Sequence, residues 1–149
     1  MNYQQKSKEI TLLLLTSKQY QASRSIHIYN SLKSEPDTQY IINHAKKSSR
    51  DIYYPHKDPY SNEENIDLAI IPGTLFDKYM HRKGRGGGYY DKFLSTNNTI
   101  IKVGLTFQQN VISYIKPNTW DIDMDMVITE NGIITPNNPI KLDYINSWR

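Results

Sequence analysis

The chain has 149 residues, of which 38% are hydrophobic and 22% are charged, and its net charge is +3, which is typical of one soluble globular domain. It contains no cysteine, which excludes disulfides and thiolate metal sites and favours a reducing, cytoplasmic location. The longest purely aliphatic run, Leu12 to Leu15, is too short to span a membrane, and the charge is too small to indicate nucleic acid by itself. We therefore expect a single monomeric domain over residues 1–149, with neither a membrane nor a nucleic acid as its partner.

The first half of the chain alternates helical with strand-like segments. A polar segment with an apolar end predicts the first helix, alternating β-branched and aromatic residues predict the first strand, and Pro36 followed by the capping candidate Asp37 predicts the second helix. In chain order the predictions are a helix over 2–16, a strand over 25–30, a helix over 34–47, a strand over 51–54 and a surface connection over 55–65.

The second half is richer in strands. The apolar run "IDLAII", closed by Pro72-Gly73, is typical of a strand buried on both faces. In chain order the predictions are a strand over 66–71, one or two helical turns over 89–94, a strand over 99–107, a short helix over 110–115, and strands over 124–129 and 131–135. This alternation favours an α/β fold, a three-layer open and mainly parallel sheet flanked by helices. Ligands of such sheets bind beyond the carboxyl ends of the strands, which is where the loop after Gly73 begins.

That loop contains the most unusual stretch of the chain, "HRKGRGGGYYDKF" (His81–Phe93). Consecutive glycines let backbone N–H groups converge on an anion without Cβ obstruction. If Gly88 leads into a helix, the helix dipole adds to that field. The cations Arg82, Lys83 and Arg85 would neutralise phosphate oxygens. The combination predicts a site for a triphosphate.

Familiar nucleotide motifs do not explain this loop. No glycine is followed by lysine and a hydroxyl residue, so it is not a P-loop, and the dinucleotide pattern fails because Tyr89 or Asp91 stands where its last glycine is required. A plain surface turn with solvated arginines is the alternative that remains. Because the chain has no cysteine and no Gly-x-Ser-x-Gly motif, nucleophilic catalysis has little support, and chemistry would depend on phosphates, a metal and positioning.

Acidic residues near the loop are candidates for a magnesium site. Asp91 directly follows the two tyrosines, and "WDIDMDM" supplies Asp121, Asp123 and Asp125, which would share one face of an extended chain. Magnesium takes one or two protein carboxylates together with phosphates and water. An EF-hand is excluded because its sixth position would be Met126 rather than glycine. Taken singly, each aspartate is better explained as a solvated or capping residue than as a metal ligand.

Together these segments resemble a known family. The stretches "IDLAIIPGTLFDKYMHRKGRGGGYYDKFL", "KVGLTFQQN" and "WDIDMDMVITENGI" closely resemble the 5-formyltetrahydrofolate cyclo-ligase family, strongly over residues 66–133 and more weakly back through "YQASRSIHIYNSLKSEPDTQYII". The resemblance implies an enzyme that uses ATP and Mg²⁺ to convert 5-formyltetrahydrofolate into 5,10-methenyltetrahydrofolate, with release of ADP and phosphate. A phosphorylated formyl group is the implied intermediate.

The resemblance also implies roles for particular residues. Asp91 and Asp121 fall on the metal carboxylates, and Asp125 on a further aspartate. Glu35 falls on a folate-binding glutamate and Asn30 on a folate contact. The nucleotide loop comprises Arg82, Gly84, Arg85, Gly86, Gly87, Gly88, Tyr89 and Tyr90; among these, Arg85 and Tyr90 are the predicted catalytic residues, and Arg85 and Tyr89 also contact the folate.

The chain departs from the family pattern in several places. It is shorter than the usual members of the family. We expect it to lack the basic first helix whose cations reach the ATP phosphates in the family, and we do not expect Lys6 and Lys8 to replace those cations. Part of the folate pocket between residues 45 and 65 is also expected to be missing, and Lys83 replaces an apolar residue. Two alternatives therefore stay open: a degenerate homologue that binds nucleotide or folate without turnover, and an RNA-binding protein that uses the Arg-Gly-Tyr loop.

Overall fold

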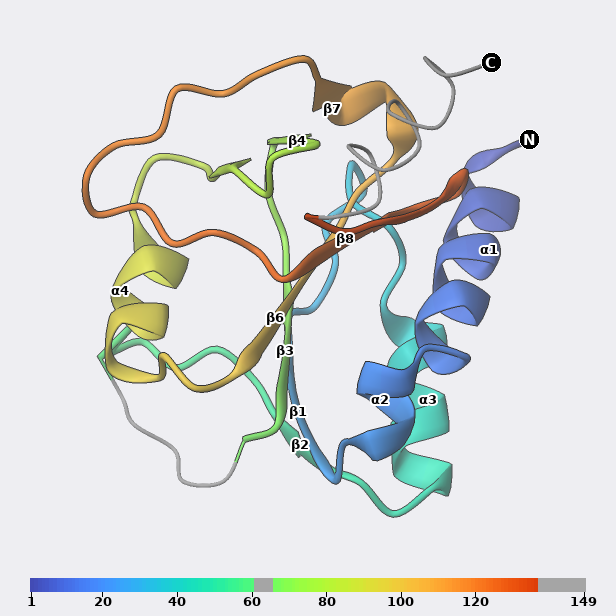
Figure 1. Ribbon diagram of the computed structural model, residues 1–149. Helices are drawn as coiled ribbons and strands as arrows, with labels where there is room; N and C mark the ends of the chain where they lie inside the picture. Colours follow the sequence, from blue (N-terminus) through green and yellow to red (C-terminus); the bar gives the residue numbers. More distant parts are fainter. Residues whose placement is uncertain (61–65, 137–149) are drawn as a thin grey trace.

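The computed structural model describes residues 1–60 and 66–136, in which helices cover both faces of a central sheet (Figure 1). The helices are α1 (Tyr3–Leu15), α2 (Lys18–Ala22), α3 (Gln39–Lys47) and α4 (Tyr89–Thr96), with a 3₁₀ turn, η1 (Gln108–Asn110). The central strands are β1 (Ser25–Ile28), β2 (Asp51–Tyr53), β3 (Leu68–Ile71), β6 (Ile101–Leu105), β8 (Met126–Thr129) and β9 (Gly132–Ile134). None of the helices in these ranges is both long and apolar enough to cross a membrane.

The strands of the central sheet are ordered β2-β1-β3-β6-β8-β9, and all neighbours pair in parallel except β8 and β9. The predicted α/β fold with a mainly parallel sheet is therefore confirmed. Parallel strands need crossover connections, which α3 and α4 supply. Their carboxyl ends consequently meet at one edge of the sheet, where a ligand site is expected.

Both faces of the sheet are buried, as the apolar run before Pro72 predicts. In β3, Leu68 and Ile70 pack with α1 and α3, while Ala69 and Ile71 pack with α4. Figure 1 shows α1 and α3 on one side of the sheet and α4 on the other. The core thus has two layers, and α4 is fixed against the face opposite α1.

A second, three-stranded sheet of order β5-β4-β7 lies beside the first and was not predicted. Its strands are β4 (Leu75–Asp77), β5 (Arg82–Lys83) and β7 (Val111–Ile112). The helix predicted over 110–115 is wrong, because Val111–Ile112 pairs in parallel with β4. Helix α2 was also not predicted. Residues 61–65 of the predicted 55–65 connection, and 137–149 of the predicted domain, lie outside the described residues.

Phe76 in β4 joins the two sheets by packing where Gly104 of β6 leaves room. A Cβ built on Gly104 would contact the Phe76 ring at several atoms, and one on Gly73 would lie 2.9 Å from the same ring. Glycine at these two positions therefore allows the small sheet to lie close to the large one.

Replacing Gly104 by alanine is expected to lower the free energy of unfolding by about 1–3 kcal/mol, because Phe76 must move in a filled core. Urea denaturation of the purified variant measures this. Gly87→Ala is the matched control, since a Cβ there meets nothing within 4 Å. Equal stability of the two variants would contradict the packing argument.

Candidate functional site

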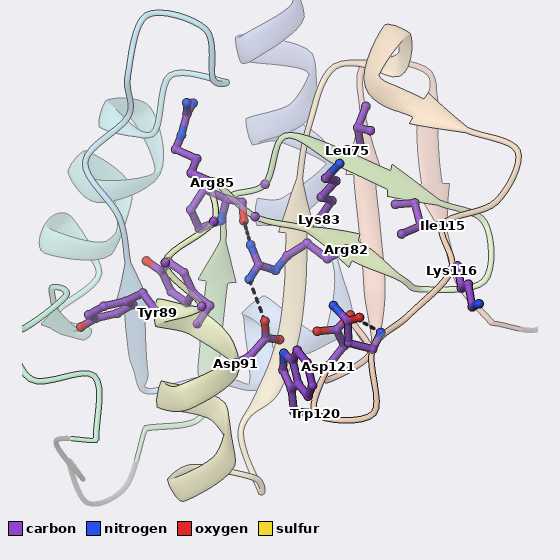
Figure 2. Close-up of a pocket in the computed structure, with 18 of the residues that line it drawn as sticks. Leu75, Arg82, Lys83, Arg85, Tyr89, Asp91, Ile115, Lys116, Trp120 and Asp121 are labelled. Atoms are coloured by element: carbon purple, nitrogen blue, oxygen red, sulfur yellow. Dashed lines mark hydrogen bonds and ion pairs between the residues drawn. The ribbon is translucent and has the colours of Figure 1, made fainter.

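A cavity of about 770 Å³ opens at the carboxyl edge of the central sheet, between α4 and the small sheet (Figure 2). Most of the residues predicted for the site line it: Glu35, Arg82, Lys83, Gly84, Arg85, Gly86, Gly87, Gly88, Tyr89, Tyr90, Asp91 and Asp121. These come from three distant parts of the sequence. The volume falls within the range of small-molecule sites in proteins.

The glycine loop forms one wall and leads into α4. Gly86 and Gly88 have φ angles of 107° and 67°, a left-handed region that glycine adopts without strain. Gly88 is the N-cap of α4, and no side chain in the described residues caps the helix there. The positive end of the helix dipole therefore acts on the cavity, as the sequence predicts for an anion site.

Arg82 is fixed beneath this loop. Its side chain is only 5% exposed, and its Nη1 donates a 2.8 Å hydrogen bond to the carbonyl of Pro72. The guanidinium also lies 3.9 Å from Asp91 Oδ2 and 5.6 Å from the centre of the Tyr90 ring. Any Cβ on Gly84 would approach Arg82 Nη1 to 2.9 Å. Arg82 is thus a preorganised cation that also aligns Asp91.

Arg85 and Glu35 face each other across the mouth of the cavity. Arg85 Nη2 lies 3.6 Å from Glu35 Oε2 and donates to Ser34 Oγ at 3.2 Å. Glu35 is 5% exposed, and its Oε1 accepts from the N–H of Leu32 at 2.8 Å. The loop after β1 and the glycine loop are thereby connected by an ion pair, with the Arg85 side chain still half exposed.

The two predicted metal ligands lie on the same wall. Asp91 accepts a 3.3 Å hydrogen bond from the N–H of Ile122, and Asp121 accepts one of 2.8 Å from the N–H of Asn118. Burial raises the pKa of Asp91 and the Asp121 carboxylate raises it further, while Ile122 N–H and Arg82 oppose that shift. Two carboxylates on one cavity wall form a set of oxygen ligands that suits Mg²⁺.

Tyr89 and Tyr90 point in different directions from the start of α4. The Tyr89 hydroxyl donates to the carbonyl of His56 at 2.7 Å and so holds the connection after β2 against the glycine loop. Tyr90 is 8% exposed, its hydroxyl has no partner within the described residues, and burial raises its pKa. A buried hydroxyl on a cavity wall without a partner can hydrogen-bond a ligand.

Asp77 holds together the turn that delivers the loop. It is fully buried in β4 and accepts from the N–H groups of Tyr79, His81 and Ile115, at 3.0, 2.9 and 2.7 Å, and from Nδ1 of His81 at 2.9 Å. One carboxylate thereby connects the β4–β5 turn to the segment after β7. Asp77 lies within the stretch on which the family resemblance rests, but no role was predicted for it.

Three other predicted candidates lie elsewhere. Asn30 is exposed beyond β1 and is not on the described lining of the cavity. Asp123 is exposed. Asp125 accepts from the Lys102 N–H at 2.7 Å and pairs with Lys102 Nζ at 3.2 Å, at the start of β8. Asp125 thus neutralises a lysine away from the cavity wall that carries Asp121.

The remaining wall was not predicted from sequence. It comes from the small sheet and the segment after β7: Leu75, Ile112, Ile115, Lys116, Asn118 and Trp120. The predicted cation Lys83 lines the same cavity. Trp120 directly precedes Asp121 and is 67% exposed, which is unusual for so large a side chain. No local motif marks this wall, since only the pairing of β7 with β4 places it at the cavity.

Beneath the cavity, His27 of β1 is buried without hydrogen-bond partners in the described residues. Its ring stacks on Phe93 at 4.4 Å and meets the edge of Tyr90 at 6.0 Å between centroids. Burial, with a smaller contribution from His56, lowers the pKa of His27 to about 4. The neutral imidazole is thus the form that fits this core.

Acid is therefore expected to destabilise the protein through His27. The unfolded chain binds a proton near the ordinary histidine pKa of 6.5, whereas the folded chain does so near a pKa of about 4. The stability that depends on neutral His27 is therefore complete above pH 6.5 and is lost progressively as the pH falls from 6.5 to about 4. The loss should be about 2–3 kcal/mol in the free energy of unfolding. Urea denaturation at several pH values between 7 and 4 measures the free energy of unfolding as a function of pH. Its slope against pH should be smaller for His27→Phe than for the wild type, and identical slopes would contradict this role of His27.

Comparisons with known proteins agree with the geometry. Residues 55–130 match the model of the 5-formyltetrahydrofolate cyclo-ligase family. A probable 5-formyltetrahydrofolate cyclo-ligase of Caenorhabditis elegans is 25% identical over 88% of this chain and 84% of its own, and the 5-formyltetrahydrofolate cyclo-ligase of Mus musculus is 28% identical over 80% and 82%.

Solved structures show the same fold. The 5,10-methenyltetrahydrofolate synthetase of Aquifex aeolicus superposes with a TM-score of 0.75 at 22% identity, covering 87% of this chain and 80% of its own. The 5,10-methenyltetrahydrofolate synthetase of Mycoplasma pneumoniae superposes with a TM-score of 0.72 at 21% identity, covering 86% of this chain and 87% of its own.

Proposed function

Because the chain belongs to the 5-formyltetrahydrofolate cyclo-ligase family, we propose that it converts 5-formyltetrahydrofolate into 5,10-methenyltetrahydrofolate with ATP and Mg²⁺, releasing ADP and phosphate. The observation that supports this most directly is the single cavity that brings together the glycine loop, Glu35 and both Asp91 and Asp121. The family supplies the reaction, and the cavity supplies groups suited to each reactant.

The two ends of the cavity differ in chemistry. Glu35, Arg85 and Tyr89 form an end with hydrogen-bonding and aromatic groups, which suits the folate ring system. The glycine loop with Arg82 and the start of α4 forms an anion-binding end, which suits the triphosphate. The arrangement would bring the terminal phosphate toward the formyl group, and such positioning is a large part of phosphoryl-transfer catalysis.

Asp91 and Asp121 fit Mg²⁺, because two carboxylates on one wall can hold it together with phosphate oxygens and water. When bound, the ion would neutralise the charge of the transferring phosphoryl group. Arg82 orients Asp91 and stays protonated beside it, and Ile122 N–H holds the other carboxylate oxygen.

The proposed chemistry needs no protein nucleophile. The formyl oxygen attacks the terminal phosphorus, the bond to the bridging oxygen breaks, and ADP leaves. N10 then attacks the activated formyl carbon and loses its proton, and the carbon–oxygen bond breaks with departure of phosphate. The N5 lone pair completes the methenyl bridge. The half-exposed Arg85 can neutralise phosphate charge in both steps, while Tyr90 offers a hydroxyl to the reacting groups.

Absorbance of methenyltetrahydrofolate at the border of the ultraviolet and visible ranges tests the proposal. Purified protein with 5-formyltetrahydrofolate, ATP and Mg²⁺ should form product, and omission of ATP should abolish it. Arg85→Ala should lower turnover, and unchanged turnover would remove Arg85 from the site. ATP binding without any product would instead identify the degenerate homologue.

The RNA-binding alternative is disfavoured by the position of the tyrosines. Base stacking needs exposed aromatic faces, yet Tyr90 is buried and Tyr89 is partly buried, with its hydroxyl bonded to His56.

A further inference from the structure

The cations on the cavity wall are not equally available to a ligand. Four line it, namely Arg82, Lys83, Arg85 and Lys116, together with the three carboxylates Glu35, Asp91 and Asp121. Arg82 lies against Asp91 and Arg85 against Glu35, at 3.9 and 3.6 Å. Neither lysine has a carboxylate within ion-pair distance in the described residues. The uncompensated positive charge of the wall is therefore on Lys83 and Lys116.

From this we infer that Lys83 and Lys116 bind the phosphate groups of the nucleotide, an inference that rests on the proposed function. Both side chains are exposed, so each flexible ammonium group is free to turn toward a phosphate. Figure 2 shows both lysines on the side of Arg82 away from Tyr89. Asp121, which has no ion pair among the described residues, lines the same cavity.

The charge balance supports this assignment. Once the arginine pairs are set aside, two lysines remain with one carboxylate, Asp121. A divalent ion bound there would add further positive charge. Only an anionic ligand balances such a wall in a partly enclosed cavity, where charges are screened less than in bulk water. A magnesium-bound nucleotide phosphate has that charge.

The lysines of the first helix are used elsewhere. Lys6 lies 3.6 Å from Glu130 and 5.8 Å from the centre of the Phe107 ring, and Lys8 lies 5.7 Å from the centre of the Tyr40 ring. Neither is on the described lining of the cavity. Since the lysines of α1 do not line the cavity, Lys83 on β5 and Lys116 in the segment after β7 would supply the phosphate-binding cations instead.

Calorimetric titration with ATP, ADP and AMP in the presence of Mg²⁺ tests the inference. Lys83→Met and Lys116→Met remove the charge and keep an apolar stem, and Lys18→Met on α2 is the matched control. Each test variant should bind ATP about tenfold more weakly, since a contact to a charged group is worth about 1.5 kcal/mol or more. AMP affinity should change little, because the lost contacts are to the outer phosphates.

The outcomes separate this inference from the proposed function. Suppose that the wild type binds ATP and makes product, while Lys83→Met and Lys116→Met bind ATP with the same affinity as Lys18→Met. That result would refute the assignment of the two lysines and leave the proposed function standing. Equal losses of ATP and AMP affinity would also refute it, because the stems rather than the charges would then matter. If the wild type binds no ATP, the proposed function and this inference fail together.

Discussion

Asp77→Ala is expected to lower the free energy of unfolding by about 3–5 kcal/mol, the largest stability effect of any single change considered for this chain. Four hydrogen bonds converge on this buried carboxylate, from Tyr79, from both the backbone and ring of His81, and from Ile115. Alanine would leave these donors unsatisfied in a site without room for bulk water. Asparagine is nearly isosteric with aspartate, but only one of its two terminal groups can accept hydrogen bonds. The stability of Asp77→Asn should therefore lie between those of the wild type and Asp77→Ala.

Urea denaturation followed by circular dichroism measures this effect. Asp58→Ala is the control, because Asp58 is exposed and accepts one backbone hydrogen bond, from Tyr60; it should lose no more than about 1 kcal/mol. Asp77 also connects the turn before Arg82 to the segment before Lys116. Equal stability of the two variants would show that this connection does not hold the small sheet in place.

Asp91→Asn is expected to lower turnover by about a hundredfold and to raise the Mg²⁺ concentration needed for half-maximal rate. The change removes one of two ligand charges from the proposed metal site, and several kcal/mol of transition-state stabilisation depend on such an ion. The fold should persist, because Arg82 keeps its bond to Pro72 and Asn can still accept from Ile122 N–H.

Rate measurements over a Mg²⁺ titration test this second effect, with thermal unfolding recorded in parallel. Asp123→Asn is the matched control, since Asp123 is exposed and lies outside the described cavity wall. An unchanged Mg²⁺ titration in Asp91→Asn would exclude Asp91 from metal binding. A large effect in Asp123→Asn would place Asp123 in the metal site instead.

Features with a local signature were predictable from the sequence. The run of glycines before two tyrosines predicted the loop and the start of α4 at Tyr89, whereas anion binding by that loop stays a prediction. The apolar run before Pro72 predicted β3 with both faces buried. In each case neighbouring residues fix the backbone, so the pattern and the structure agree.

Features that depend on pairing between distant segments could not be predicted from the sequence. Strands β4, β5 and β7 have two or three residues each, too few for a period to appear. The alternation of Asp121, Asp123 and Asp125 predicted a shared face, but residues 121–125 do not form a strand, so the rule of alternating faces does not hold there. The position of the cavity wall that carries Lys116 likewise depends on the pairing of β7 with β4.

The central claim is that the glycine loop binds the triphosphate, and a titration of ¹⁵N-labelled protein with Mg-ATP, followed by amide NMR, tests it most directly. The chain has seven glycines, whose amide signals are well separated from most others. Those of Gly86, Gly87 and Gly88 should shift strongly, and those of Gly104 and Gly132, which lie in strands, should not. Saturable ATP binding that leaves the loop signals unmoved, or that moves only the strand glycines, would contradict the account.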